Sequence, residues 1–540
     1  MSERILVCTA WPYVNGSLHV GHLAGVYVPA DTFARFQRLR GNDVLMVSGS
    51  DEHGTPIILR ADQEGVSPKE IGDKYHAEFL GYWRDLGISY DLYTRTGTET
   101  HSRVVQAEFT DLLEKEYLFE ASVDQFYDET AGRFLQDRYI EGTCPHCGYD
   151  RARGDQCDNC GHLLDPDQLI EPRSKLTGGR PVPRSTTHLF FDLRKLNDRL
   201  VEWVRPMTHW RPNVYRFTLN FLEGGLQPRA VTRDLDWGVP VPVAGYEDKR
   251  VYVWIEAVTG YLSASVEWAE RQGRADAWEP WWKDPQARQY YFIGKDNIPF
   301  HTVIWPAILM ARGDTILPYD VPANEYMNFG GAKASKSANI GTTVPDLLAA
   351  FDPDPIRYYL TANAPESADT DFSADDLIRR NNDELVATWG NLVHRTLTFV
   401  QRYFDGRVPG DGATDPVVAR QIDDTFALVT ARLEAVRLKE TVRDVMALAH
   451  FGNRYFDEKA PWRQVKEDQA EAGRTVGTLL NLLNALKVLF APFLPFSSAR
   501  LHELLGYQHQ LEEDGWAWTP VPIGQSLPKP TPLFTKIETS

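Results

Sequence analysis

Four of the five cysteines lie in one short segment. Cys144 and Cys147 form one C-x2-C pair, and Cys157 and Cys160 form a second pair after nine intervening residues. Each pair can hold one metal ion from a tight turn, and two pairs together make a tetrahedral thiolate site. Four thiolates leave no open coordination position, so the pattern predicts a structural zinc ion. Iron suits the same ligands, and four free core cysteines are the alternative without a metal.

Two histidines, His19 and His22, stand at the start of a predicted helix that directly follows a predicted strand. Imidazoles at this spacing can both face a phosphate chain, and the helix N-terminus adds partial positive charge and free N–H groups. Gly21, between them, would let a nucleotide lie close to the backbone. The short pattern alone is equally compatible with two ordinary core or surface histidines.

Two lysines, Lys333 and Lys336, follow a Gly-Gly pair in a segment that shows no strand or helix pattern. A glycine-hinged loop with two ammonium groups suits a mobile clamp on phosphates, although a solvated basic loop is the commoner meaning of such a pair. A third ammonium group, Lys295, stands between Gly294 and Asp296 directly after a predicted buried strand.

The segments that must position these residues have the pattern of an open parallel sheet. Short apolar runs at 5–8 and 44–48 predict buried strands, and a helical pattern from about 22 to 39 connects them. This β–α–β order predicts a parallel sheet, in which ligands bind beyond the carboxyl ends of the strands. Asp51 and the residues after the first strand both fall at that edge.

Strand patterning returns at 251–254 and 289–293, after a segment of different character that contains the cysteines. We therefore expect an α/β protein: a split Rossmann-like nucleotide-binding domain, an inserted zinc-knuckle domain and a C-terminal helical bundle, predicted from amphipathic patterns at 387–403, 416–436 and 476–489. The expected units are a first catalytic half at 1–115, the insertion at 116–237, a second catalytic half at 238–325, a stem-contact region with the lysine loop at 326–385, and the bundle with a loose Pro-rich tail at 386–540.

Composition excludes several classes of function. The 540 residues are 43% hydrophobic and 24% charged, which is ordinary for a globular chain. No apolar stretch approaches the ~18 residues of a membrane span, and no secretory signal precedes the first strand. A net charge of −18 argues against coating DNA by charge alone. Residues 386–463 carry 11 Lys and Arg against 10 Asp and Glu, so a polyanion could dock there, unless the bundle is simply neutral.

In combination, these features resemble the class I aminoacyl-tRNA synthetases, and closely the methionyl-tRNA synthetase family. The resemblance covers nearly the whole chain and is carried by AWPY at 10–13, NGSLHVGH at 15–22, SDEHGTP at 50–56, YVWIEA at 252–257, FIGKD at 292–296 and KAPW at 459–462. It implies that methionine attacks the α-phosphate of ATP to give methionyl-adenylate and pyrophosphate, and that the terminal ribose of tRNA(Met) then takes the acyl group. Neither step demands a protein nucleophile, so the protein must align reactants and neutralise phosphate charge.

The resemblance also implies roles for individual residues. His19 and His22 would hold the triphosphate and the transition state, and Lys333 and Lys336 would clamp the leaving pyrophosphate, with a magnesium ion on the phosphates. Further ATP contacts would come from Gly21, Gly294, Lys295 and Asp296. Asp51 would pair with the ammonium group of methionine, whose side-chain slot would be lined by Ala10, Trp11, Tyr13, Trp254, Ala257, Tyr261 and His301. Without the neighbouring motifs, the Trp254, Ala257 and Tyr261 face is more often plain core.

For tRNA, the residues Asn391, Arg395 and Trp462 match positions that read the anticodon in this family, and stacking and base-edge hydrogen bonding suit them. Read in isolation, Trp462 is as well explained as a buried aromatic. Two residues depart from the family pattern: Ala334 replaces the usual methionine of the lysine loop, and Trp11 replaces a smaller apolar residue. The chain ends soon after the bundle without an appended tRNA-binding and dimerisation domain, which favours a monomer. Sparse cysteines fit a reducing cytoplasm.

Three alternatives fit parts of the pattern. Leucyl, isoleucyl and valyl enzymes share the nucleotide motifs but carry a large editing insertion, for which ~120 residues with a knuckle leave little room. A cysteinyl enzyme directs its zinc at the substrate thiol, which a closed four-cysteine site cannot do. A non-enzymatic zinc-knuckle RNA-binding protein would have no need of the intact histidines and lysines.

Overall fold

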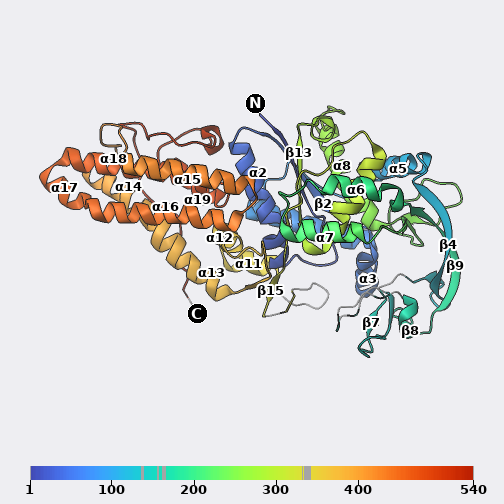
Figure 1. The fold of residues 1–540 in the computed structure, drawn as a ribbon. Helices are drawn as coiled ribbons and strands as arrows, with labels where there is room; N and C mark the ends of the chain where they lie inside the picture. Colours follow the sequence, from blue (N-terminus) through green and yellow to red (C-terminus); the bar gives the residue numbers. More distant parts are fainter. Residues whose placement is uncertain are drawn as a thin grey trace.

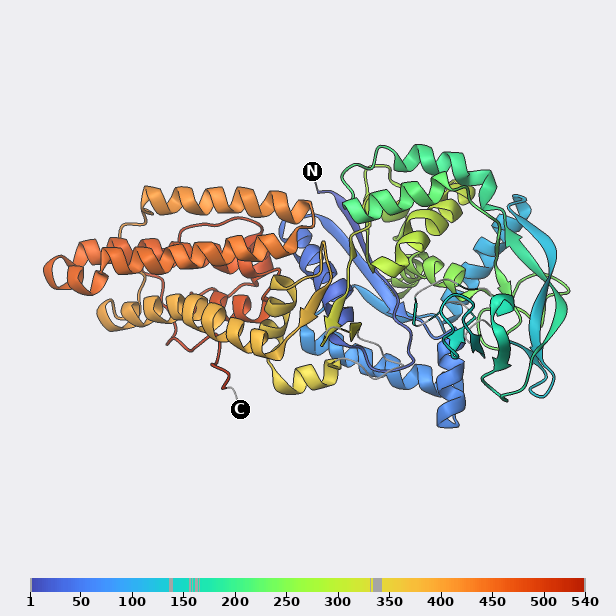
Figure 2. The same ribbon diagram turned by 60° about the horizontal axis from the view of Figure 1, so that its bottom comes forward.

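The computed structural model describes residues 2–135, 139–154, 157, 159–160, 164, 166–330, 332–333 and 342–538. Figure 1 shows an elongated molecule with a helical bundle at one end and a sheet flanked by helices in the middle. Long antiparallel strands and the cysteine segment form the other end, and the view in Figure 2 shows the same order. Within the described ranges, no helix is both long enough and apolar enough to cross a membrane.

The central sheet has five strands, all parallel, as the sequence predicts. Its order is β14 (Ala323–Asn324), β13 (Arg288–Gly294), β1 (Arg4–Thr9), β2 (Asp43–Ser50) and β3 (Leu92–Arg95). The chain adds β2 and β3 on one side of β1 and then β13 and β14 on the other. The order therefore reverses between β1 and β13, which is where open parallel sheets bind their ligands.

Helices cover this sheet and lead away from its carboxyl edge. They are α1 (Val20–His22), the π-helical η1 (Leu23–Tyr27), α2 (Val28–Leu39), α3 (Thr55–Glu64), α4 (Pro68–Leu86), α5 (Glu99–Glu114), α8 (Val253–Arg271), α9 (Glu279–Lys283), η5 (Lys295–Asn297), η6 (Phe300–Ile304) and α10 (Trp305–Arg312). Ser67 and Glu70 form a capping box at the start of α4, and Gly87 ends that helix with φ 68°.

The predicted strand at 251–254 is wrong. Only β12 (Arg250–Val251) is extended, and it pairs antiparallel with β11 (Thr232–Arg233) outside the central sheet. Val253 already lies in α8. The β-branched and aromatic residues of this run have strand propensity, but the longer segment buries a helical face, and tertiary packing overrides local propensity.

The insertion contains two antiparallel sheets. One has the order β10 (Arg229–Ala230), β9 (Val182–Phe191), β4 (Leu118–Asp128) and β5 (Arg133–Phe134); the other has β7 (Ala152–Arg153), β6 (Ile140–Thr143) and β8 (Ile170–Ser174) beside the cysteines. Two helices of the same segment, α6 (Asn197–Val204) and α7 (Pro212–Glu223), pack on the catalytic core instead. The Thr218 hydroxyl of α7 donates a hydrogen bond of 2.9 Å to the Thr302 hydroxyl of η6.

A small sheet is formed by β15 (Met327–Phe329), β16 (Ala332–Lys333) and β17 (Thr370–Phe372). The helices predicted beyond residue 385 are present, and others precede them. The helices are α11 (Val344–Ala350), α12 (Pro353–Ala362), α13 (Ala374–Arg380), the π-helical η7 (Asn381–Gly390), α14 (Asn391–Tyr403), α15 (Pro416–Glu434), α16 (Leu438–Lys459), α17 (Pro461–Glu467), α18 (Gln469–Phe490) and α19 (Pro495–Leu504). The tail, with the short η8 (Leu511–Asp514), packs on the bundle but is not loose, because Val521, Leu527 and Leu533 are buried.

A buried ion pair joins the bundle to the sheet domain. Arg357 of α12 is fully buried and pairs with Asp31 of α2 at 2.7 Å. Its guanidinium also donates to the backbone oxygens of Leu86, Pro492 and Phe493 at 2.9–3.2 Å. Burial alone would raise the pKa of Asp31, but Arg35 and Arg357 hold it below its usual value. The Arg357 side chain therefore contacts both the helical bundle and the sheet domain.

Candidate active site and metal centre

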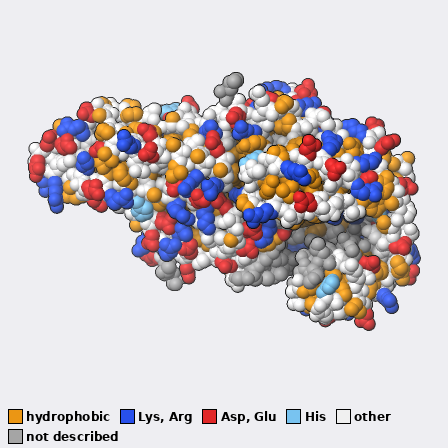
Figure 3. Space-filling view, in the orientation of Figure 1, with side chains coloured by type: hydrophobic (Ala, Val, Ile, Leu, Met, Phe, Trp, Pro, Cys, Tyr) orange, Lys and Arg blue, Asp and Glu red, His pale blue; other side chains and the backbone are white. Residues whose placement is uncertain are grey.

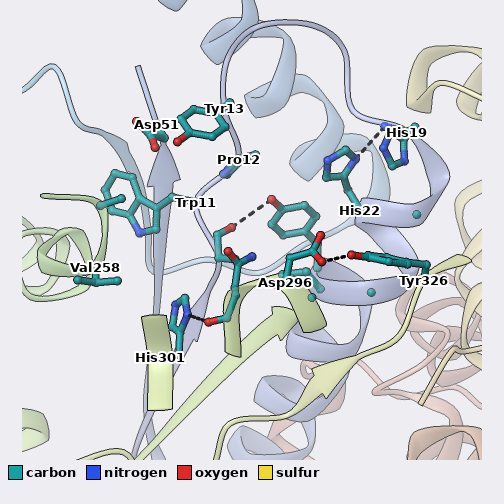
Figure 4. A pocket seen from close by; sticks show the side chains of 18 of the residues that line it. Trp11, Pro12, Tyr13, His19, His22, Asp51, Val258, Asp296, His301 and Tyr326 are labelled. Carbon is teal, nitrogen blue, oxygen red and sulfur yellow. Dashed lines mark hydrogen bonds between the residues drawn. The ribbon is translucent and has the colours of Figure 1, made fainter. Parts of the chain in front are cut away.

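One cavity of about 340 Å³ opens at the carboxyl edge of the sheet, beside the point where the strand order reverses. Its walls include thirteen residues that the sequence singles out: Ala10, Trp11, Tyr13, His19, Gly21, His22, Asp51, Trp254, Ala257, Tyr261, Gly294, Asp296 and His301. Figure 4 shows His19 and His22 on one side of this cavity, with Asp51 and Trp11 on another. Residues from five separate segments thus converge on one space.

The histidine pair forms one wall. The rings of His19 and His22 lie 3.8 Å apart between centroids, and the His19 backbone N–H donates to Nδ1 of His22 at 3.2 Å. Gly21 lies close to both neighbours, because a Cβ there would lie 3.1 Å from the His19 ring and 3.2 Å from the Met327 carbonyl oxygen. Gly21 therefore lines the cavity with little room for a side chain, and its contact with a nucleotide stays a prediction.

The ends of the lysine loop lie beside the histidines. Thr343 forms a β-bridge with His19, and the Val20 backbone N–H donates to the Thr342 oxygen at 3.0 Å. At the other end, Lys333 lies in β16, which pairs with β15 next to Gly21. The side chain of Lys333, together with Ala334 and Lys336, lies outside the described residues.

The G-K-D segment (Gly294, Lys295 and Asp296) stands at the end of β13 as predicted, but its lysine does not line the cavity. The ammonium group of Lys295 pairs with Glu325 at 2.7 Å and with Asp369 at 2.8 Å. Asp296 does line the cavity and accepts a hydrogen bond from the Tyr326 hydroxyl. Glu325, Tyr326 and Asn297 also line it, although sequence reasoning did not find them; Asn297, directly after G-K-D, was the one with a local signal.

Asp51 is a buried carboxylate at the end of β2, with only 3% of its surface exposed. It accepts a hydrogen bond of 3.1 Å from the His53 backbone N–H. Burial, and then the nearby carboxylate of Glu256, raise the pKa of Asp51 well above its ordinary value. A cation placed beside Asp51 would reverse both effects, so the position suits an ammonium group.

Behind Asp51 lies a buried charge network that sequence reasoning missed. Glu256 of α8 contacts Nδ1 of His53 at 2.5 Å and Nε2 of His101 at 3.2 Å. Burial would raise the pKa of Glu256, but the two histidines lower it to about 2, and Glu256 in turn raises the pKa of His53. The network ties the loop after β2 to helix α8. It joins residues about 200 positions apart, which no local pattern reveals.

Aromatic rings line the part of the cavity that the resemblance assigns to the side chain of methionine. Trp254 stacks on Phe300 with centroids 4.3 Å apart and meets Tyr13 edge-on at 6.2 Å. At its inner end, Nδ1 of His301 lies 2.9 Å from the Asn297 carbonyl oxygen, and Nε2 lies 2.7 Å from the Tyr261 hydroxyl. Burial lowers the pKa of His301 to about 4, so the ring is neutral at pH 7. The Asn297 carbonyl places its proton on Nδ1, and the Tyr261 hydroxyl donates to Nε2.

Trp11 fits its site because two glycines face it. A Cβ on Gly49 would lie 2.3 Å from the Trp11 ring, and one on Gly260 would lie 2.9 Å from it. The ring also packs near His101, at 5.9 Å between centroids. The larger side chain is thus accommodated by missing methyl groups on β2 and α8, and it still lines the cavity.

The three predicted anticodon residues lie at the far end of the bundle. Arg395 of α14 pairs with Asp457 at 2.6 Å and lies 3.8 Å above the Phe456 ring, which stacks on Trp462 at 5.8 Å. Trp462 is 37% exposed, and Asn391 is exposed on the first turn of α14. A planar, partly exposed aromatic beside a guanidinium offers a stacking surface for bases.

The four cysteine sulfurs meet as a metal site requires. The sulfurs of Cys144 and Cys160 lie 3.8 Å apart, those of Cys147 and Cys157 lie 3.6 Å apart, and all four ligand atoms fall within 4.8 Å of one another. A tetrahedron with metal–sulfur bonds of about 2.3 Å has edges of about 3.8 Å, so the residues fit one metal ion. A hydrogen bond from Asn159 contributes most to lowering the pKa of Cys147 to about 6.

Comparisons with known proteins agree with this geometry. The family model described as tRNA synthetases class I (M) matches residues 5–397, and the model described as the anticodon binding domain of methionyl tRNA ligase matches residues 408–540. The chain is 52% identical over 570 residues to the methionine–tRNA ligase of Thermomicrobium roseum, and 50% identical over 578 residues to that of Roseiflexus sp. strain RS-1. Both alignments cover 100% of this chain and 98% of the relative.

A solved structure extends the likeness to three dimensions. The crystal structure of Mycobacterium tuberculosis methionyl-tRNA synthetase bound by methionyl-adenylate superposes with a TM-score of 0.81 at 25% identity, covering 99% of this chain and 100% of that one. The fold and the matched length agree with these relatives, and the chain belongs to the methionyl-tRNA synthetase family of class I aminoacyl-tRNA synthetases.

Proposed function

We propose that this chain attaches L-methionine to tRNA(Met) through a methionyl-adenylate intermediate, consuming ATP and releasing AMP and pyrophosphate. The observation that best supports this reaction is a single cavity that joins a buried carboxylate and an aromatic slot to a histidine pair. An amino acid held by its ammonium group and side chain would present its carboxylate toward the histidine wall. ATP held at the histidine wall would have its α-phosphate in line with this carboxylate. Positioning of this kind supplies most of the rate in a reaction without a protein nucleophile.

At the amino-acid end, Asp51 binds the ammonium group. The side-chain slot is formed by Ala10, Trp11, Tyr13, Trp254, Ala257, Tyr261 and His301. A thioether is apolar and polarizable, and it packs favourably on aromatic rings. The apolar and aromatic character of these walls and the neutral state of His301 support an uncharged side chain as the substrate.

At the nucleotide end, His19 and His22 hold the triphosphate, and Lys333 and Lys336 neutralise the leaving pyrophosphate. The anchoring of Thr343 on His19 supports this pairing, because it brings the end of the lysine loop to the histidine wall. Gly21, Gly294 and Asp296 line the nucleotide side. Lys295 acts from outside the cavity, through its ion pair with Glu325.

We further propose which metal ions the protein binds, its oligomeric state and where in the cell it acts. The four-cysteine site holds Zn²⁺, for which the sulfur spacing is suitable, and this ion stabilises the knuckle without taking part in the reaction. Mg²⁺ accompanies the ATP phosphates. The protein acts as a monomer in the cytoplasm, where thiolate ligands remain reduced. Asn391, Arg395 and Trp462 read the tRNA anticodon.

Amino-acid-dependent exchange of pyrophosphate into ATP tests the first step directly. The wild-type protein should exchange with methionine and not with leucine, isoleucine or cysteine. Lys336→Ala should lower the exchange rate while the metal content stays at one ion per chain. Equal exchange with leucine, or none with methionine, would refute the proposed reaction. Unchanged exchange in Lys336→Ala would refute only the role of that lysine.

A further inference from the structure

The π-helical segment η1 forms part of the cavity wall through its backbone. Gly25, in the middle of η1, lines the cavity, and a Cβ added there would meet none of the described residues within 4 Å. The packing of the protein itself therefore leaves open space at this position. Because η1 directly follows His22, the path of its backbone also sets the position of the histidine wall. The contacts that hold η1 thus decide the shape of the space beside the histidines.

The carbonyl oxygen of Gly25 is held from outside the helix. In an α-helix this oxygen would accept from the N–H four residues later, but that residue is Pro29, which has no N–H. The side-chain amide of Asn324 donates to the Gly25 oxygen instead, at 2.6 Å. Asn324 is a fully buried residue of β14, at the edge of the central sheet. The sheet therefore stabilises a π-helical turn, a kind of turn that is frequent at functional sites.

Arg211 determines which way the Asn324 amide faces. Arg211 stands directly before α7 and donates to Oδ1 of Asn324, which leaves the amide nitrogen for Gly25. A guanidinium only donates, so the oxygen of the amide must face it. The same guanidinium also donates to the backbone oxygens of Ala323 at 3.2 Å and of Val436 at 2.9 Å. Arg211 thus joins the bundle to β14, and Asn324 joins β14 to the cavity wall.

The turn of the bundle that Arg211 contacts has a strained backbone. Val436, between α15 and α16, has φ 52°, a left-handed conformation that a β-branched residue rarely adopts. Such a backbone persists only where its surroundings determine it, and Val436 is buried among residues of the sheet domain. Figure 3 shows the bundle and the sheet domain meeting in one continuous surface. The contact of Arg211 with Val436 therefore belongs to a fixed junction between the two parts.

We propose that Asn324, oriented by Arg211, is a positioning residue for the nucleotide: it holds the Gly25 backbone in the place where ATP can lie against η1. This inference rests on the proposed function, which supplies ATP as the ligand of this wall. Asn324 does not itself line the cavity and acts through the backbone of η1. Figure 4 shows His22, which precedes η1, on the opposite side from Asp51, so the effect should fall on ATP and not on methionine.

Asn324→Asp tests this role in the full-length protein. The new carboxylate keeps its contact with Arg211 but cannot donate to the Gly25 oxygen. A buried carbonyl without its donor makes the wall adopt the correct position less often, and the apparent affinity for ATP falls by that fraction. The KM for ATP in methionine-dependent pyrophosphate exchange should rise roughly 5- to 100-fold, with the KM for methionine near wild type. Calorimetry of ATP binding without methionine should show the same loss.

Two further variants separate the hydrogen bond from charge and from the role of Arg211. Asn324→Ala introduces no carboxylate and should show the same selective loss of ATP affinity, which repulsion between Asp and ATP would not produce. Arg211→Lys can still donate to Asn324 and should retain more ATP affinity than Arg211→Met. Equal ATP affinity in the two Arg211 variants would overturn the part of the inference that concerns Arg211.

Asn453→Asp is the matched control. The Asn453 amide of α16 also donates to a backbone oxygen of a π-helix, that of Thr388 in η7, at 2.9 Å. Neither residue lines the cavity, so this variant loses an equivalent hydrogen bond and should keep both KM values near wild type. An equal rise of the KM for ATP in Asn453→Asp would overturn the inference, because general loosening of the fold would then explain the loss.

Two results for Asn324→Asp would also overturn the inference: an unchanged KM for ATP, and equal rises in the KM values for ATP and methionine. Failure of the proposed reaction is distinguishable from both. A wild-type protein that binds ATP but does not exchange pyrophosphate with methionine would refute the reaction. Weaker ATP binding to the Asn324 variants, measured by calorimetry, would still support the positioning role.

Discussion

Replacing Asp51 with asparagine should damage catalysis and stabilise the empty enzyme. In the folded chain, the Asp51 carboxylate is buried beside Glu256, and both burial and that charge raise its pKa. The free protein therefore bears the cost of an uncompensated buried carboxylate. When methionine binds, its ammonium group should neutralise that charge. The side chain would thus oppose folding in the free enzyme and favour binding in the complex.

The expected magnitudes follow from the burial of the pair. Breaking a buried ion pair by removing one partner costs about 3–5 kcal/mol. The ratio kcat/KM for methionine in pyrophosphate exchange should therefore fall by roughly 10²- to 10⁴-fold. The KM for ATP should stay near wild type. In the free protein, relief of the buried charge should raise the free energy of unfolding by about 1–3 kcal/mol at pH 7.

The pH dependence has a definite sign. Asp51 ionises near pH 3.9 when unfolded and at a higher pH when folded, so stability falls as pH rises between those two values. The extra stability of Asp51→Asn relative to wild type should be absent below about pH 4 and should grow above it.

Urea unfolding of the free protein, with and without methionine, measures this gain. Glu108→Gln is the control, because burial raises the pKa of Glu108 to about 7 in a different part of the core. It should gain stability without changing the KM for methionine. An Asp51→Asn protein that is less stable than wild type, or that retains methionine activation, would refute the reasoning.

Three further predictions concern other parts of the molecule. Glu256→Gln breaks the contacts with His53 and His101. The stabilising contribution of Glu256 is present above about pH 4.5, and that of His53 is fully present below about pH 6.5. Urea unfolding should therefore show a larger loss of stability near pH 6, about 3–5 kcal/mol, than at pH 9, and an equal loss at both would contradict the pairing. Cys144→Ser should abolish the one bound metal ion per chain, measured by elemental analysis, and hydrogen exchange should increase in β6–β8 while β1 and β13 stay protected; loss of protection throughout the sheet would contradict a local structural role. Trp462→Ala should raise the KM for tRNA by a factor that reflects about 1–3 kcal/mol of base stacking, with methionine-dependent exchange unchanged; a parallel loss of both activities would show that Trp462 supports folding.

The sequence predicts the parts of this protein that depend on local pattern. Continuous apolar runs give β1, β2 and β13, and helical periodicity gives the bundle. The spacing of the cysteines predicts sulfurs that converge. The proximity of the lysine loop to His19 followed from chemistry, because one polyphosphate would need both, and the bridge at Thr343 places the end of the loop there.

Other parts could not be read from local pattern. The run at 251–254 has strand-forming residues, but the buried face of α8 extends far beyond it and determines the helix. The network of Glu256 with His53 and His101 joins three elements through buried charges, and nothing in the sequence near any one of them signals the others. Lys295 occupies the predicted position, yet Glu325 and Asp369 draw its ammonium group out of the cavity, and both acids come from later segments.

The contact of Trp11 with Gly49 and Gly260 constrains how this pocket can change over evolutionary time. An alanine at Gly260 would be tolerated only after position 11 had become smaller, so the order in which these two replacements arise is fixed. Lineages that keep the tryptophan should retain both glycines. Those with a compact residue at position 11 are free to gain a methyl group at position 260, whereas position 49 stays a glycine because its Cβ would also lie 2.8 Å from the Thr94 carbonyl oxygen.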